Sequence, residues 1–126
     1  MKKYFIGMLA LVLAIGFSAF TKPVKKAPSA TIFLEFQGVP TNATQVADET
    51  LWQEVAEQSC DEIRDDKACA VEVNVADVDG TAPHRYLKVS RIDFGATAGA
   101  AGATDGYIPT KVGGASTNAF TLFNRD

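Results

Sequence analysis

The first twenty residues constrain this chain most, because they cannot belong to the same folded body as the rest. Met1 is followed by two lysines, Lys2 and Lys3, and residues 4–20 then carry no charge at all. A positive start followed by an apolar run is typical of a secretory signal peptide, in which the apolar part enters the membrane as a helix. We therefore expect residues 1–21 to be a signal peptide.

Small residues end the apolar run, as signal peptidase requires. The pairs Gly16/Ser18 and Ala19/Thr21 both fit this requirement, and they place the mature start near Ala19 or Lys22. The run is close to the minimum length of a permanent membrane span, and lysines follow it. An uncleaved signal that anchors the protein to the inner membrane is therefore the alternative.

Removing the predicted leader makes the net charge of the remaining chain more negative. The whole chain has 12 basic and 15 acidic residues, and the excess of acid is larger from residue 22 onward, which argues against nucleic-acid binding. Leu, Ile, Val and Phe are sparse there, so the apolar core is thin and needs a further constraint. Residues 22–30 contain two prolines and three lysines and are expected to be a flexible linker. Residues 31–126 are expected to form a single small globular domain.

Cys60 and Cys69 are the only cysteines in the chain. In an exported protein such a pair is most simply a structural disulfide, because the compartment beyond the inner membrane is oxidising. Closing so short a loop contributes about 2 to 3 kcal/mol on the chain-entropy model. A redox pair or a metal site is the alternative, but redox pairs usually have two residues between the cysteines and metal sites need more cysteine or histidine. The sequence therefore predicts a structural disulfide between Cys60 and Cys69.

The apolar pattern predicts an α+β fold: a small, mostly antiparallel β domain with one amphipathic helix. Residues 31–36 are rich in β-branched and aromatic side chains, which predicts a strand. Asn42 is suited to cap a helix N-terminus, with Gln45 three residues later. Apolar residues then recur at helical spacing and predict an amphipathic helix from about Thr44 to Ser59, docked on the sheet through Trp52.

Alternating patterns predict the remaining strands. Residues 71–78 and 85–94 both alternate between apolar and polar side chains, which predicts one antiparallel hairpin. The stretch 95–106 is almost wholly glycine, alanine and threonine and is expected to be a mobile loop. A second hairpin is predicted between residues 107–112 and 119–123, across a Gly-Gly pair.

The chain lacks the sequence signatures of a catalytic site. His84 is the only histidine, and it follows Pro83 in a predicted turn, where we expect it to be exposed. No Gly-x-Ser-x-Gly elbow supports a Ser-His-Asp arrangement, and no phosphate-binding or dinucleotide-binding motif is present. We therefore predict no enzymatic activity and no cofactor. A small exported hydrolase that uses His84 is the alternative.

Four carboxylates crowd the segment between the cysteines: Asp61, Glu62, Asp65 and Asp66. They could hold a hard cation weakly, so a weak calcium-binding module is a further alternative. A solvated acidic surface, eased by neighbouring basic residues, is the preferred interpretation, and no metal site is predicted. Residues 74–80 resemble a calcium loop superficially, but the ligand register fails because a valine would occupy the first ligand position.

The leader begins Met-Lys-Lys and ends Phe-Ser-Ala-Phe-Thr-Lys, and it looks like the leaders of small exported proteins of Bacteroidota. The pattern of Trp52, Cys60, Cys69-Ala-Val, a Gly-rich stretch and a terminal Asn124-Arg125 is similar to a domain-of-unknown-function family from those bacteria. That family has no assigned activity or catalytic residues. The resemblance therefore implies export and no known chemistry.

Together these features predict an exported, non-catalytic protein of the envelope or the extracellular space, which acts by binding or as a structural component. The sequence does not indicate the partner. Contact with a membrane is expected only through the N-terminal segment before its cleavage.

Overall fold

The computed structural model describes residues 30–60 and 65–125, and the regular structure within them is mostly antiparallel β. The predicted signal peptide, its cleavage positions and the linker up to residue 29 lie outside these described residues. The elements are β1 (Thr31–Phe36), α2 (Ala43–Val46), the 3-10 helix η1 (Glu49–Leu51), β2 (Trp52–Val55), β3 (Lys67–Asn74), the 3-10 helix η2 (Val75–Asp77), β4 (Val78–Asp79), β5 (Tyr86–Leu87), β6 (Asp93–Ala98), β7 (Tyr107–Gly113) and β8 (Thr121–Arg125). None of the described helices is long and apolar enough to cross a membrane.

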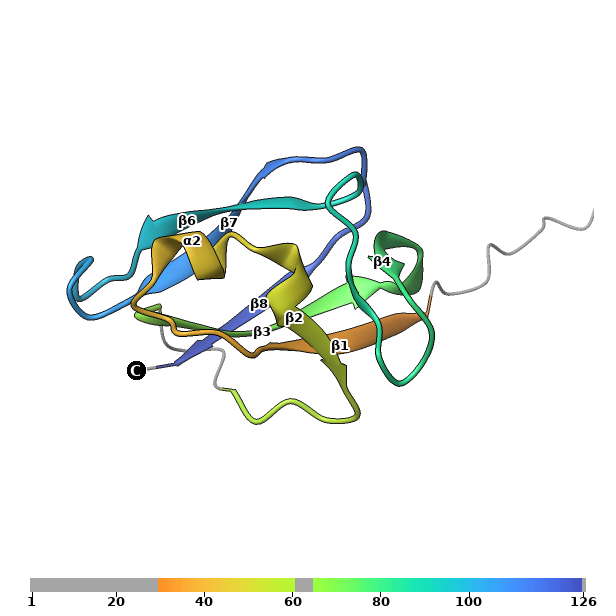
Figure 1. Cartoon of the computed structure of the whole chain (residues 1–126), viewed down its shortest axis with the longest axis horizontal. Coiled ribbons are helices and arrows are strands. Elements are labelled where there is room, and N and C mark those ends of the chain that lie inside the picture. The colour runs from red at the N-terminus through yellow and green to blue at the C-terminus, as the bar shows by residue number, and fades with distance from the viewer. Residues whose placement is uncertain (1–29, 61–64, 126) are drawn as a thin grey trace, which may run out of the picture.

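Six strands form one sheet that is curved into a half-barrel, and two strands form a hairpin packed over it (Figure 1). The strand order in the sheet is β4-β5-β2-β1-β3-β8, and the hairpin consists of β6 and β7. Every strand pairing is antiparallel. The expectation of an α+β fold is therefore confirmed only in its antiparallel β part, since the described helices are all short.

The strand predicted over residues 31–36 is confirmed as β1, which lies in the middle of the sheet. Leu34 and Phe36 are buried, and Ile32 packs against the core from the same face, as period-two alternation requires. β1 pairs with β3 on one side and with β2 on the other. Because β1 has a partner strand on each side, its apolar face lies in the middle of the sheet and contributes to the centre of the core.

The helix predicted over Thr44–Ser59 is wrong beyond its first turn. Only α2 forms, and the Asn42 side chain caps it as predicted, accepting from the backbone N–H groups of Thr44 and Gln45. The Gln45 side chain does not return to the cap residue as in a capping box, because its Oε1 accepts from the N–H of Val39 at 2.7 Å. The cap motif is therefore real, but it begins a helix of only one turn.

Strand pairing explains why this helix stops. The Asp48 side chain accepts from the N–H of Thr50 and starts η1, and the chain is extended from Trp52 onward. There it pairs with β1, with Phe36 opposite Trp52. Helical spacing in a sequence is a weak preference that tertiary pairing can override, and here the open side of β1 is filled instead.

Trp52 is the centre of the core, as its place in the apolar stripe predicted. Its side chain is fully buried, and its indole N–H donates to the carbonyl of Val46 at 3.1 Å. Its ring lies 5.1 Å from that of Phe36 and 5.4 Å from that of Phe94. The three rings belong to β2, β1 and β6, so this aromatic contact joins the sheet to the hairpin above it.

The first predicted hairpin forms only at its tip. Val78 pairs with Leu87 and Asp79 with Tyr86, which makes the short β4–β5 hairpin. The longer segment before it, β3, pairs with β1 and β8 instead. The predicted strand over 85–94 is split because residues 88–91 form a turn, in which the N–H groups of Arg91 and Ile92 donate to the carbonyl of Lys88.

The second predicted hairpin is wrong, and so is the expected loop character of the whole stretch 95–106. β7 pairs with β6, whose residues 95–98 come from that Gly-rich stretch, and β8 pairs with β3. Small side chains allow this arrangement, since a Cβ at Gly106 would lie 2.5 Å from the Lys67 side chain. Close packing therefore explains the glycines at 95, 99 and 106, whereas a Cβ at Gly102 would meet nothing within 4 Å and its φ of 103° favours glycine.

Candidate functional site

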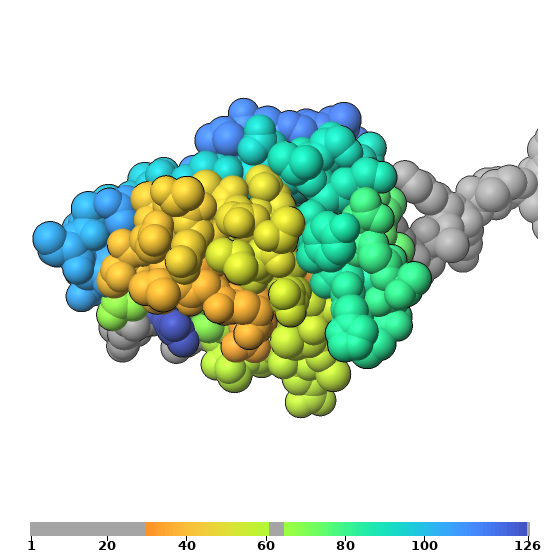
Figure 2. Space-filling view, viewed as in Figure 1, coloured from red at the N-terminus to blue at the C-terminus, as the bar shows by residue number. Residues whose placement is uncertain are grey.

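A hollow of about 400 Å³ lies on the surface beside β5. It is formed where the segment after β4 meets η1, and these two segments lie directly against each other in Figure 2, in teal and yellow. The residues that line it are Glu49, Thr50, Asp79, Tyr86, Leu87, Lys88, Val89 and Ser90. Among these, Leu87 is buried, whereas Tyr86 is 37% and Val89 57% exposed. The hollow thus has apolar surface open to solvent, with carboxylate, hydroxyl and ammonium groups around it.

A buried carboxylate positions the turn that forms one wall of the hollow. Asp77 is fully buried, and its carboxylate accepts from Arg91 Nε at 2.9 Å, Ser116 Oγ at 2.7 Å and Asn118 Nδ2 at 2.9 Å. Its backbone carbonyl accepts from the N–H of Lys88 at 3.1 Å. One residue of η2 therefore ties the 88–91 turn to the connection between β7 and β8.

The hydrogen bonds keep Asp77 ionised. Burial by itself would raise the pKa of this carboxyl. The hydrogen bonds from Ser116, Asn118 and Arg91, together with the charge of Arg91, outweigh burial and hold the pKa of Asp77 below its usual value. Asp77 is thus an ionised residue with a structural role. Its hydrogen-bond partners among the described residues are side chains of the protein itself.

A second ion pair, between Arg85 and Glu54, lies where the start of β5 meets β2. Arg85 Nε donates to Glu54 Oε2 at 2.8 Å, and Arg85 Nη2 donates to Glu54 Oε1, so the contact is bidentate. This hydrogen bonding lowers the pKa of Glu54, although partial burial acts in the other direction. Both side chains are largely covered. The pair therefore joins β2 to the start of β5 and helps to position Tyr86.

His84 is exposed in the turn between β4 and β5, as predicted. Its backbone N–H donates to the carbonyl of Thr81 at 2.8 Å. His84 is not among the residues that line the hollow. This placement does not test the alternative of a small exported hydrolase that uses His84, which stays a hypothesis.

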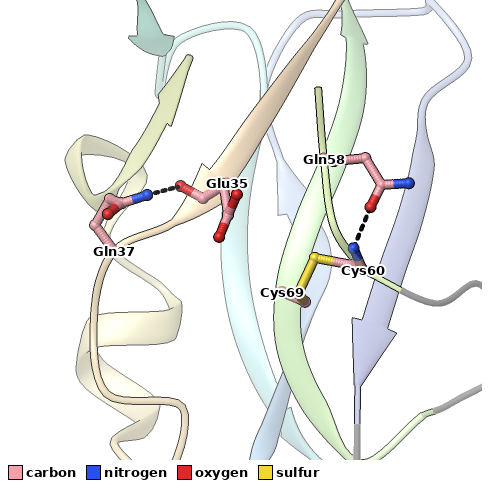
Figure 3. The surroundings of a disulfide bond; sticks show 5 residues. All are labelled: Glu35, Gln37, Gln58, Cys60 and Cys69. Atoms are coloured by element: carbon pink, nitrogen blue, oxygen red, sulfur yellow. Dashed lines mark hydrogen bonds between the residues drawn. A yellow bond between two sulfur atoms is a disulfide. The ribbon is translucent and has the colours of Figure 1, made fainter. Parts of the chain in front are cut away.

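The predicted disulfide between Cys60 and Cys69 is present (Figure 3). Cys69 lies on β3 and is buried, whereas Cys60 follows β2 and is half-buried. The Gln58 side chain accepts from the N–H of Cys60. The bond therefore ties the chain after β2 to the next strand but one in the sheet.

The predicted acidic cluster is only partly described, because Asp61 and Glu62 lie outside the described residues. Asp65 Oδ1 accepts from Asn124 Nδ2 at 3.3 Å, and Asp66 Oδ1 accepts from the N–H of Ala101 at 2.9 Å. Within residues 30–60 and 65–125, no three His, Cys, Asp or Glu side chains are placed to hold a metal ion. Both described carboxylates thus have hydrogen-bond donors of the protein.

Sequence reasoning considered Asp77 only as a failed calcium ligand and missed its network. In the alternating run of β3 and η2, Asp77 has the same parity as Val71 and Val73, which are buried, but also as Val75, which is 37% exposed, so alternation alone does not identify it. A carboxylate in an inward position must be paired or strongly hydrogen-bonded. Its partners Ser116 and Asn118 are distant in sequence, and no local pattern points to them.

One family emerges from comparison with known proteins. A family model described as a family of unknown function (DUF6520) matches residues 1–84. No curated protein and no solved structure matches the chain. The match includes the predicted signal peptide, both cysteines and His84, while the Gly-rich stretch and Asn124-Arg125 lie beyond it.

Proposed function

The chain belongs to the family of unknown function DUF6520, and we propose that it is an exported, non-catalytic protein that binds a polypeptide partner in the envelope or outside the cell. The leader, with two lysines before an uncharged run over residues 4–20 and a likeness to leaders of exported Bacteroidota proteins, supports export. The Cys60–Cys69 disulfide agrees with maturation in an oxidising compartment. The observation that carries the binding role is the hollow beside β5, with Tyr86 and Val89 exposed.

The chemistry of the hollow favours a segment with apolar and basic side chains. Tyr86 and Val89 offer apolar surface, and Glu49 and Asp79 are two carboxylates against the single ammonium of Lys88. The carboxylates are each used by one backbone N–H, that of Phe94 for Glu49 and that of Gly80 for Asp79, through one oxygen. A second oxygen of each can meet a basic side chain. The chain has an acidic net charge of −3, which also favours a basic partner.

The hydrogen bonds made by the carboxylates of Asp77 and Glu54 favour a binding role over catalysis. Asp77 is surrounded by three donors, and Glu54 is held by Arg85 in a bidentate contact. A general acid or base needs a pKa near the working pH and access to substrate. These two carboxyls have lowered pKa values and structural partners, which suits a scaffold for the hollow rather than proton transfer.

Export is tested by the mass of the mature chain. Cells that make the full-length protein are separated into cytoplasmic, envelope and medium fractions, and the intact mass is measured in each. We expect a chain that begins near Ala19 or Lys22 in the envelope or the medium, because the leader is removed during export. A chain that retains Met1 and stays in the cytoplasm would overturn the proposal.

Binding at the hollow is tested by photocrosslinking in the same cells. A benzophenone amino acid replaces Val89, and the matched control replaces Val112, which lies on β7 and is 66% exposed. We expect a discrete light-dependent adduct with another polypeptide at position 89 and none at position 112. A discrete adduct at both positions, or at neither, contradicts binding at the hollow.

The charge of the partner is tested by adding Asp79→Lys to the position 89 probe. Asp79 is exposed, and its carboxylate bonds only to the adjacent Gly80 N–H among the described residues, so reversal should leave the fold intact. A basic partner predicts a weaker adduct. An equal or stronger adduct would exclude a basic segment as the occupant of the hollow.

A further inference from the structure

The chain contains two Asp-Gly pairs, Asp79-Gly80 and Asp105-Gly106. In such a pair the backbone nitrogen of the glycine can attack the side-chain carboxyl of the aspartate, because glycine has no Cβ to obstruct the approach. The attack closes a five-membered succinimide ring, which water reopens mainly to isoaspartate. The structure holds the two pairs in different surroundings, which indicate the pair that reacts.

Asp79-Gly80 lies at the edge of the molecule, where β4 ends and the loop to β5 begins (Figure 1). Both residues are exposed, and so are the next four residues of the loop. The Gly80 N–H donates to Oδ1 of Asp79 at 2.9 Å, so the attacking nitrogen already lies beside the carboxyl that it attacks. Among the described residues this N–H has no other acceptor, so closing the ring breaks no bond to another part of the fold.

Asp105-Gly106 lies in the turn between β6 and β7 and is held by its surroundings. The Gly106 N–H donates to the carbonyl of Gly102 at 3.2 Å. The Asp105 carboxylate forms an ion pair with Lys67, with an N–O distance of 3.7 Å. Gly106 is also buried, and a Cβ on it would lie 2.8 Å from the carbonyl oxygen of Asp66. Ring closure here must therefore break a hydrogen bond, separate an ion pair and move closely packed backbone.

We propose that Asp79 is a site of spontaneous modification, at which the folded protein converts aspartate to isoaspartate, and that the fold protects Asp105 from the same reaction. The Gly80 nitrogen bonds to the side-chain carboxyl carbon of Asp79, and the carboxyl hydroxyl leaves with the amide proton as water. Water then adds to the ring carbonyl that was the backbone carbonyl of Asp79, and the bond from that carbon to the nitrogen breaks. The main chain now runs through the former side-chain carbon. One water is lost and one is gained, so no oxidant or reductant is needed.

Isomerisation at Asp79 would alter the hollow beside β5. Asp79 lines the hollow and pairs with Tyr86 across the β4–β5 hairpin. Isoaspartate places an additional methylene carbon in the main chain and leaves the free carboxylate on a shorter branch. The register between Asp79 and Tyr86 should therefore be lost. The reaction itself does not depend on what the hollow binds.

Peptide mapping of aged protein tests the site. Folded protein with its disulfide formed, and a reduced, alkylated sample in guanidinium chloride, are held side by side near neutral pH for several weeks. Tryptic peptides are then fragmented by electron transfer, which distinguishes isoaspartate from aspartate. We expect the ratio of isoaspartate at Asp79 to that at Asp105 to be at least about fivefold higher in the folded sample, because the fold opposes the reaction only at Asp105. Asp77 and Asp93 lie on the same two peptides, 68–85 and 92–111, and serve as internal controls, since valine and phenylalanine follow them.

Asp79→Glu is the matched variant, and Asp105→Glu is its control. Glutamate keeps the charge, but its ring would have six members and closes far more slowly. Isoaspartate in aged folded protein is measured as methyl groups accepted from a protein isoaspartate methyltransferase. We expect Asp79→Glu to remove most of this signal and Asp105→Glu to leave it nearly unchanged. Equal ratios in the folded and unfolded samples, an excess at Asp105, or no isoaspartate at Asp79 in folded protein would each overturn the proposal.

Discussion

Replacing Trp52 by alanine should lower the free energy of unfolding by about 3 to 5 kcal/mol, the range for a fully buried aromatic side chain. The loss is large because this one side chain packs against both the six-stranded sheet and the β6–β7 hairpin. The ring contacts Phe36 of the sheet and Phe94 of the hairpin, and the indole N–H bonds to the carbonyl of Val46. With so few large apolar residues, the chain has little else to close the cavity. Urea unfolding followed by circular dichroism measures the effect.

Trp52→Phe is the matched control. It keeps an aromatic ring between sheet and hairpin but loses the hydrogen bond to Val46, so its cost should lie clearly below that of alanine. A loss of less than about 1 kcal/mol for Trp52→Ala would contradict a core centred on this residue.

Replacing Asp77 by alanine is expected to cost about 3 to 5 kcal/mol, as for other buried ion pairs that lose one partner. The substitution removes the acceptor of Arg91, Ser116 and Asn118, of which Ser116 is itself buried. It also frees the 88–91 turn, so the wall of the hollow should lose its order. Unfolding in urea gives the free energy, and the exchange of the Lys88 amide reports the turn. Asp79→Asn, an exposed neighbour, should be nearly neutral in both measurements.

The same residue predicts a pH dependence. The pKa of Asp77 is lower in the folded protein than in the unfolded chain, so the folded state favours the ionised form. Its contribution to stability is therefore complete above the unfolded pKa of about 4 and is lost as the pH falls through the folded value. Asp77→Asn removes this contribution, and the difference in unfolding free energy between wild type and variant should shrink toward acid pH. A difference that is constant from neutral pH down to about pH 3 would contradict an ionised Asp77.

The sequence was sufficient where a property is local. Alternation placed β1 and its inward residues, the cap at Asn42 was correct, and the cysteine pair was joined as predicted. Each of these was predicted from neighbouring residues or from the oxidising compartment expected for an exported chain. Trp52 was also assigned to the core correctly, although in a helix rather than a strand.

The errors are all errors of long-range pairing. The segment from Trp52 has both helical spacing and a possible strand, and only the free side of β1 decides between them. β8 follows β7 in sequence but pairs with β3, while β7 pairs with β6. The Asp77 network likewise joins residues that are about forty positions apart. Which strands meet is set by the whole fold, and no window of sequence contains that information.

Thiol trapping in living cells tests the central claim, an exported protein matured with its disulfide formed, most directly. Cells that make the full-length protein are quenched in acid, free thiols are blocked with an alkylating reagent, and the chain is analysed by intact mass and peptide mapping. The account predicts a Cys60–Cys69 linked peptide and a chain without its first 18 to 21 residues. A chain that still carries Met1 and has both cysteines alkylated would contradict it.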